Sequence, residues 1–108
     1  MTINHIENMH RGWFIGNFDP SVYKTDQFEV ALLSHFKDEK WPKHYHKEAV
    51  EINLLISGKM IINDVIINPG DIFVLDTFEI ADPIFLEDCK IVCIKTKSVM
   101  GDKYEVVE

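Results

Sequence analysis

The sequence has few cysteines, no long apolar run and no concentration of positive charge, and each of these absences excludes a class of protein. Cys89 and Cys93 are the two thiols among 108 residues. If they lie on one strand, as their neighbours indicate, their Cα atoms are roughly 13 Å apart, too far for a disulfide. Two cysteines also make a poor zinc site without companions, so we expect reduced, core-type thiols.

The chain also lacks the features of membrane and nucleic-acid-binding proteins. No apolar run approaches the roughly 20 residues of a membrane-spanning helix, and no basic region followed by an apolar stretch begins the chain. The net charge is −7. Because acidic and basic residues are interspersed, no basic stripe is available to neutralise a run of phosphates. We therefore expect a cytoplasmic protein that binds neither nucleic acid nor a membrane.

The composition is that of one folded domain. Apolar residues make up 46% and charged residues 27% of the chain, a balance typical of globular proteins. A chain of this length can bury a core without disulfides. We predict a single domain over residues 1–108, with its core from about 11 to 97. A short solvated arm with His5 and His10 precedes the core, and a solvated acidic tail runs from Asp102 to Glu108.

Short runs of β-branched and aromatic residues, separated by turn residues, dominate the chain. The predicted strands span 12–18, 28–36, 44–46, 50–56, 59–62, 65–67, 71–75 and 90–97. Asn63 and Asp64 tolerate the left-handed backbone of a tight hairpin. No window has helical periodicity over more than two turns. The pattern predicts an all-β fold, an antiparallel sandwich or barrel with essentially no helix.

Two histidines and a glutamate form the most informative pattern. His44 and His46 are two residues apart, so on a strand both imidazoles point to the same face. Glu51 opens the next predicted strand, and a turn between the strands would return its carboxylate to the imidazoles. Two nitrogens and one oxygen suit a divalent Fe, Mn, Ni, Zn or Co ion and leave coordination positions open. The alternative is a polar barrel mouth without metal.

From about residue 13 to residue 97 the chain resembles the cupin superfamily, in the spacing of the family's first motif: His44, His46, Glu51 and Gly58. The turn Pro69-Gly70-Asp71 is similar to the one that opens the second cupin motif. The resemblance implies a small single-domain cupin, a double-stranded β-helix also described as a jelly-roll β-barrel. It also implies that small cupins of this kind pair through an N-terminal strand. We therefore expect a homodimer, because the apolar run 13–18 would otherwise leave an exposed edge.

The second motif departs from the family pattern. Where the family has proline, glycine, histidine and asparagine, this chain has Asp76, Phe78, Ala81 and Phe85, and Asp38 stands where a glycine precedes the first histidine. Loss of the motif histidine puts a four-ligand site in question, and with it the oxidase and dioxygenase activities of the full set. Glu79 and Asp82 flank Ala81, so either is a candidate fourth ligand or general base. The alternative is that both are ordinary surface carboxylates.

Three side chains are candidates for a substrate pocket. Asn53 shares a face with Glu51 by strand alternation, so its amide is expected inside the barrel, either hydrogen-bonded to a ligand or in a structural role. Trp41 could form a wall of the pocket. His35 ends a predicted strand, although a lone histidine is more often packed or exposed than functional. Tyr45 alternates to the opposite face from the histidines and is expected outside the barrel.

Two functions stay open. The first is a metal-dependent enzyme with Lewis-acid chemistry of isomerase, dioxygenase or lyase type, acting on a small polar molecule such as a sugar or hydroxy-acid. The second is a non-catalytic module that binds a carbohydrate or another small ligand, with a structural metal or none. No serine or cysteine has a motif-level partner, so nucleophilic catalysis by a side chain has no candidate.

Overall fold

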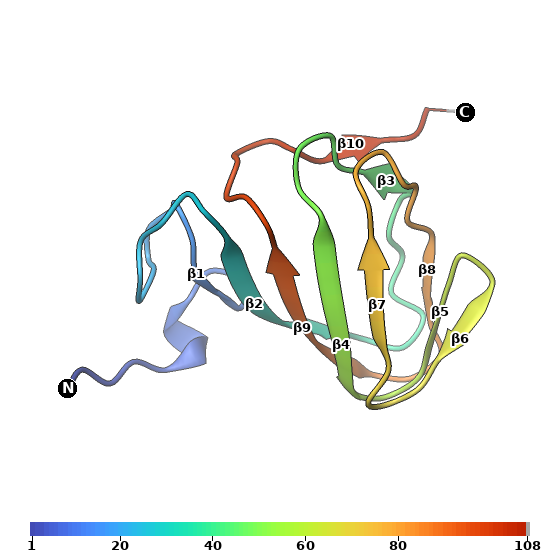
Figure 1. Ribbon diagram of the computed structural model, residues 1–108. Helices are drawn as coiled ribbons and strands as arrows, with labels where there is room; N and C mark the ends of the chain where they lie inside the picture. The colour runs from blue at the N-terminus through green and yellow to red at the C-terminus, as the bar shows by residue number, and fades with distance from the viewer. Residues whose placement is uncertain (108) are drawn as a thin grey trace.

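The computed structural model describes residues 1–107 as opposed antiparallel sheets (Figure 1). The large sheet has the strand order β1 (Trp13–Ile15), β2 (Glu29–His35), β9 (Cys89–Lys95), β4 (Glu51–Ser57), β7 (Ile72–Leu75). The second sheet has the order β6 (Val65–Ile67), β5 (Met60–Ile62), β8 (Pro83–Phe85). A third pair, β3 (His44–Tyr45) and β10 (Tyr104–Glu105), lies at one end. Helix within the described residues is limited to the 3-10 turn Ile6–Asn8.

The fold is all-β, as the sequence predicts, and all eight predicted strands are present with ends that shift by up to three residues. Asn63 and Asp64 have φ angles of 50° and 66°, the left-handed backbone expected for the hairpin between β5 and β6. Strands β8 and β10 were not predicted. They have three and two residues and become strands through pairing with β5 and β3, which local sequence does not reveal.

Strand register places charged side chains at one end of the barrel interior and apolar ones beyond it. Glu51 of β4 lies opposite Lys95 of β9, and residues in register on neighbouring strands share a face of the sheet. Asn53 lies two residues further along β4 on the same face. Leu55 lies two residues beyond Asn53, opposite Ile91 of β9. The interior therefore changes from charged to apolar within five residues of β4.

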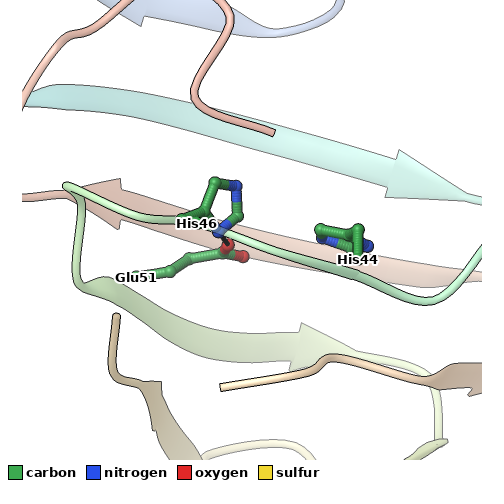
Figure 2. A group of neighbouring side chains, drawn as sticks. All are labelled: His44, His46 and Glu51. Atoms are coloured by element: carbon green, nitrogen blue, oxygen red, sulfur yellow. Dashed lines mark ion pairs between the residues drawn. The ribbon is translucent and has the colours of Figure 1, made fainter. Parts of the chain in front are cut away.

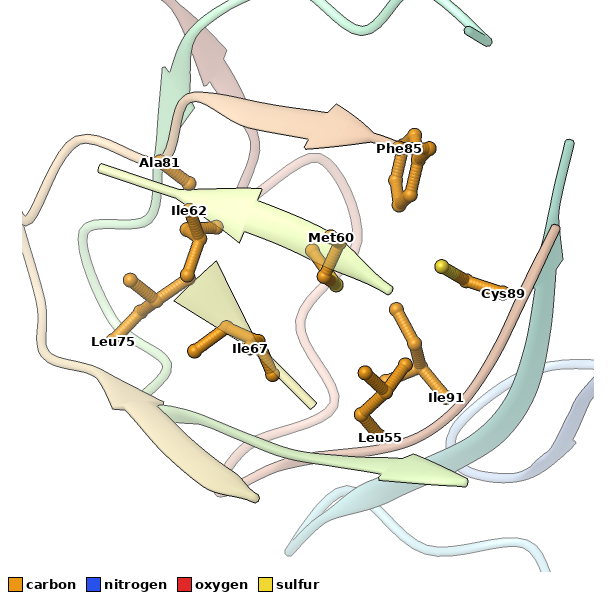
Figure 3. Packing of buried hydrophobic residues seen from close by; sticks show 9 residues of the cluster. All are labelled: Leu55, Met60, Ile62, Ile67, Leu75, Ala81, Phe85, Cys89 and Ile91. Carbon is orange, nitrogen blue, oxygen red and sulfur yellow. The ribbon is translucent and has the colours of Figure 1, made fainter. Parts of the chain in front are cut away.

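The apolar end forms the core (Figure 3). Nine buried side chains from the two sheets pack together there: Leu55, Met60, Ile62, Ile67, Leu75, Ala81, Phe85, Cys89 and Ile91. Leu55 is fully buried, and burial of such a side chain stabilises the fold by roughly 1.5–3 kcal/mol. Cys89 and Cys93 are both buried and free, which confirms the expectation of reduced thiols.

Three further residues with left-handed backbone lie at positions where the cupin motifs have glycine. Gly58, the glycine of the first motif, has a φ of 91°, and a Cβ there would lie 2.2 Å from the Asp88 carbonyl oxygen, so no other residue fits. Asp38 and Phe78 have φ angles of 62° and 65°. These are two positions at which the cupin motifs have glycine. The backbone therefore keeps the glycine conformation where the glycine itself is absent.

The outer edge of β1 is covered by the chain itself. The Val22 N–H donates to the Phe14 carbonyl at 2.8 Å, and the Thr25 N–H donates to the Gly16 carbonyl at 3.3 Å. The reason for expecting a homodimer, an exposed apolar edge at this strand, is therefore corrected. Dimerisation itself stays a prediction.

The C-terminal segment is less solvated than the sequence predicts. Asp102, placed in a solvated tail, is buried with 7% of its surface exposed, and β10 follows it. Val107 is exposed, and Glu108 lies outside the described residues. The N-terminal arm agrees with the prediction, because His5 and His10 are exposed. Among residues 1–107 no helix is long and apolar enough to cross a bilayer.

Candidate metal centre

The structure brings together the three ligands predicted from the sequence (Figure 2). His44 begins β3, His46 follows it directly, and Glu51 is the first residue of β4. One potential ligand atom from each side chain lies within 4.8 Å of the others. His46 Nδ1 lies 3.5 Å from Glu51 Oε2. An ion about 2.1 Å from each ligand atom could therefore contact all three after small side-chain rotations.

Backbone pairing on both sides of β3 fixes the two histidines. The His44 N–H donates to the Ala81 carbonyl at 3.2 Å, and the Ala81 N–H donates back to the His44 carbonyl at 2.7 Å. On its other side β3 pairs with β10, where His44 lies opposite Glu105. The Phe78 N–H donates to the His46 carbonyl at 2.6 Å. Both ligand backbones are thus held by segments distant in sequence.

A buried carboxylate fixes the turn between the histidines and the glutamate. Asp102 accepts hydrogen bonds from the backbone N–H groups of Lys47, Glu48 and Ala49 at 2.9 to 3.2 Å. Burial alone would raise the pKa of Asp102, but these three backbone donors outweigh burial and lower it. Asp102 therefore stays ionised at neutral pH and holds the turn that returns Glu51 to the imidazoles.

The two imidazoles are suited to metal binding. His44 Nδ1 lies 3.1 Å from the Pro42 carbonyl. A carbonyl only accepts, so Nδ1 carries the proton and Nε2 offers its lone pair, a common arrangement for a metal-binding histidine. Burial lowers the pKa of both His44 and His46, and for His46 the Lys95 charge lowers it further. Neutral imidazole is the form that coordinates a metal ion.

A thiol, that of Cys93, also lies beside the Glu51 carboxylate, but it is not in the form that binds a metal ion. Cys93 Sγ donates to Glu51 Oε1 at 3.6 Å. Burial, followed by the Glu51 charge, raises the pKa of Cys93 well above its ordinary value. Cys93 is therefore a protonated thiol that orients the carboxylate. The donor set that fits an ion is two imidazole nitrogens and a carboxylate oxygen, which suits a borderline divalent metal.

The three ligands line a cavity of about 610 Å³. The predicted pocket residues Asn53, Trp41 and His35 all line it as well. Asn53 Nδ2 is buried and has no hydrogen-bond partner within residues 1–107. A buried amide donor without a partner is rare, so this N–H is available to a bound ligand. Tyr45 stacks on Phe78 and Tyr104 instead, away from the cavity lining, as predicted.

Neither a protein-family model nor a curated protein matches the sequence, whereas solved structures do. The DMSP lyase DddQ from Ruegeria pomeroyi DSS-3 has a TM-score of 0.72 at 12% identity, over 87% of this chain and 49% of that chain. A double-stranded β-helix protein from Klebsiella pneumoniae has a TM-score of 0.68 at 16% identity, over 81% and 76%. The bacterial pirin YhhW from Escherichia coli, in complex with nickel(II), has a TM-score of 0.65 at 16% identity, over 82% and 39%. The chain has the cupin fold.

At these identities the likeness shows the cupin fold and no more. The chain spans about half the length of the lyase and a smaller share of the pirin. Within the cupin fold, Ala81 is buried and lines the cavity at the position where the family motif has histidine. A methyl group there adds no ligand and leaves room beside His44, to whose backbone it pairs.

The two carboxylates beside Ala81 do not line the cavity. Glu79 Oε1 accepts a hydrogen bond from the Asp76 N–H at 3.0 Å, and this contact lies in an exposed turn. The Asp82 N–H donates to Asn63 Oδ1 at 2.9 Å, which fixes the backbone of that residue outside the cavity lining. The structure thus places neither carboxylate in the cavity lining, and a fourth ligand or general base from this pair stays a prediction.

Sequence reasoning missed Glu39, which belongs to the same cavity. Its carboxylate accepts hydrogen bonds from Trp41 Nε1 and from His35 Nδ1, the latter at 2.6 Å. The His35 ring stacks on Phe85 with centroids 4.4 Å apart, which fixes its orientation. Burial would raise the pKa of Glu39. Its hydrogen bonds, of which the one from His35 has the largest effect, outweigh burial and lower the pKa. Glu39 lies in a loop, where sequence spacing gives no signal.

Proposed function

We propose that the protein binds one divalent metal ion through His44, His46 and Glu51 and catalyses a reaction of a small polar molecule in the adjoining cavity. The convergence of the three ligand atoms in the wall of that cavity carries the proposal. A bound ion would supply Lewis acidity. The pirin YhhW, which has the same fold, was solved in complex with nickel(II), and this supports a metal ion in a protein of this fold. The donor set suits Fe, Mn, Ni, Zn and Co alike.

The surrounding side chains would hold and orient the substrate. The Asn53 Nδ2 group has a buried N–H to donate, and a substrate oxygen would satisfy it. Ala81 leaves space beside His44. Trp41 forms a wall whose position is fixed by its hydrogen bond to Glu39. These groups would form one side of the substrate site and orient the substrate there.

Proton transfer would fall to His35. Its Nδ1 donates to the Glu39 carboxylate, so Nε2 is the ring atom left to exchange a proton with a ligand in the cavity. A carboxylate that orients an imidazole in this way favours proton uptake at the other nitrogen. Isomerisation or elimination next to a carbonyl requires a group that moves a proton. We assign this general-base role to His35 in place of Glu79 and Asp82.

Metal content tests the proposal. Protein purified without added metal, then exposed to an equimolar mixture of Fe(II), Mn, Ni and Zn, is expected to retain about one ion per chain. His46→Ala and Glu51→Gln should each lower metal affinity by about tenfold or more, because each removes one of three ligands. His10→Ala, which removes an exposed histidine, is the matched control. A wild-type protein that retains no metal would refute the proposal.

The second candidate is a binding module without catalysis. The buried Asn53 Nδ2 group, which has no hydrogen-bond partner among residues 1–107, favours this candidate. A ligand could accept its hydrogen bond whether or not a metal is bound. A pocket that holds a small molecule in protein without metal would support the module. Stoichiometric metal together with turnover lost in His35→Asn would support the enzyme. The cytoplasmic location stays a prediction.

A further inference from the structure

The cavity is positively charged although the chain as a whole carries −7. Two carboxylates line it, those of Glu39 and Glu51. Four cationic side chains also line the cavity: Arg11, Lys40, Lys95 and Lys103. A divalent ion would add further positive charge. An acidic protein that gathers cations around one cavity favours a negatively charged ligand there.

Lys95 lies at the metal end of the cavity. It is in register with Glu51 on the neighbouring strand, and its side chain is 19% exposed. Its ammonium group lies 3.5 Å from Glu29 Oε1 and 4.9 Å from the centre of the Trp13 ring. One carboxylate and one aromatic face thus hold Lys95 in place, and it lines the cavity with part of its hydrogen-bonding capacity unused.

Lys103 reaches the same cavity from the C-terminal segment. Its ammonium group lies 3.9 Å from the centre of the Trp41 ring. No carboxylate of residues 1–107 forms an ion pair with it. Lys103 is exposed as a whole, but desolvation of its ammonium group, followed by the Lys95 charge, lowers its pKa, which agrees with two ammonium groups that face the same cavity. An anion between them would replace this repulsion with attraction.

Beyond the charged end, the cavity lining is apolar. The side chains there belong to the core or pack against it: Leu33, Met60, Ile62, Phe73, Phe85 and Ile91. Apolar surface cannot satisfy buried hydroxyl groups, so this part of the cavity suits a hydrocarbon body and not a polyol. A volume of about 610 Å³ is that of a site for a small molecule.

We infer that the ligand is a small organic acid whose carboxylate lies between Lys95 and Lys103 and whose apolar body extends over Phe73 and Ile91. The inference rests on the proposed function in placing this acid beside the metal ligands. Recognition of the charge, however, belongs to the two lysines. It makes a sugar a poor ligand and narrows the substrate class to carboxylic acids, including hydroxy-acids.

Matched pairs of acid and amide test this inference. Lactate, 2-hydroxyisocaproate and mandelate are titrated, each against its neutral amide, into metal-loaded and metal-free wild-type protein. Tryptophan fluorescence is the readout, because Trp13 and Trp41 both line the cavity. At least one acid should bind about tenfold or more tightly than its amide, a difference of about 1.4 kcal/mol or more, because the neutral amide forms no charge pair with the lysines. Lys95→Met and Lys103→Met should each remove that preference, and Lys103→Arg should retain it.

Controls separate this inference from the metal proposal. Lys24→Met removes the same charge outside the cavity, where Lys24 pairs with Asp19, and should bind the acid as wild type does. Metal content, measured after each titration, should be unchanged in Lys103→Met, Lys103→Arg and Lys24→Met. If wild-type protein binds metal but favours no acid over its amide, or if the cavity lysine variants keep the preference, the inference is wrong. If no metal binds, a lysine-dependent preference in metal-free protein still supports it, and its absence there overturns it.

Discussion

Replacing Asp102 by asparagine tests whether the proposed metal ligands depend on a carboxylate more than fifty residues away in the chain. The Asp102 oxygens accept the N–H groups of Lys47, Glu48 and Ala49. Asparagine keeps one acceptor oxygen and turns an NH2 group toward buried Ala49. Hydrogen bonds to a charged group contribute about 1.5–3 kcal/mol, against about 1 kcal/mol for a neutral one. Losing one such bond and weakening the others should destabilise the fold by about 3 kcal/mol.

The pH dependence of this difference gives a second test. Because the pKa of folded Asp102 lies below its ordinary value, the stabilisation is fully present above the unfolded pKa of about 3.9 and is lost as pH falls through the folded pKa. The gap between wild type and Asp102→Asn should therefore be full at neutral pH and shrink below about pH 4. Urea unfolding at several pH values measures it.

The same variant should weaken metal binding. Residues that orient metal ligands through hydrogen bonds typically contribute about 10–100-fold in affinity, and Asp102 fixes the turn that joins His46 to Glu51. Glu105→Gln, on the exposed part of the same segment, is the control and should stay within about 0.5 kcal/mol of wild type. An Asp102→Asn protein as stable as this control at neutral pH, or a gap that persists unchanged at about pH 3, would show that the reasoning is wrong.

Three further predictions concern the fold. Gly58→Ala should destabilise the protein by at least about 2 kcal/mol, measured by thermal unfolding, because its Cβ would meet the Asp88 carbonyl in a left-handed backbone. Leu55→Ala should cost about 2–5 kcal/mol in urea unfolding, since Leu55 is fully buried in the core. Cys89 and Cys93 should resist a thiol reagent in the native protein and react in urea, because burial raises the pKa of both. Rapid native labelling would contradict their placement.

The features that the sequence predicts correctly depend on neighbours in the chain. His44 and His46 share a face because of strand alternation, and Glu51 follows within one turn. The Asn63-Asp64 hairpin depends on two adjacent residues with left-handed tolerance. In each case the physical cause acts over fewer than ten residues, so the local pattern contains it.

The features that the sequence does not predict depend on contacts between distant segments. Asp102 and Lys103 belong to a segment with an ordinary acidic composition. Asp102 is buried and Lys103 lines the cavity because β10, which follows them, pairs with β3. Glu79 and Asp82 show the converse, because both lie within two residues of Ala81 in sequence and neither lines the cavity that Ala81 lines. Proximity along the chain was a poor guide to proximity in the cavity.

Asp38 and Phe78 bear on how far a sequence can diverge while its shape persists. Left-handed backbone costs a non-glycine residue about 1–2 kcal/mol. At Phe78 that cost is offset by the hydrogen bond to the His46 carbonyl and by stacking on Tyr45. Where neighbours stabilise the conformation in this way, a residue other than glycine can hold the same left-handed backbone. Two chains can thus share a backbone while sharing few residues, and a TM-score of 0.72 accompanies 12% identity here.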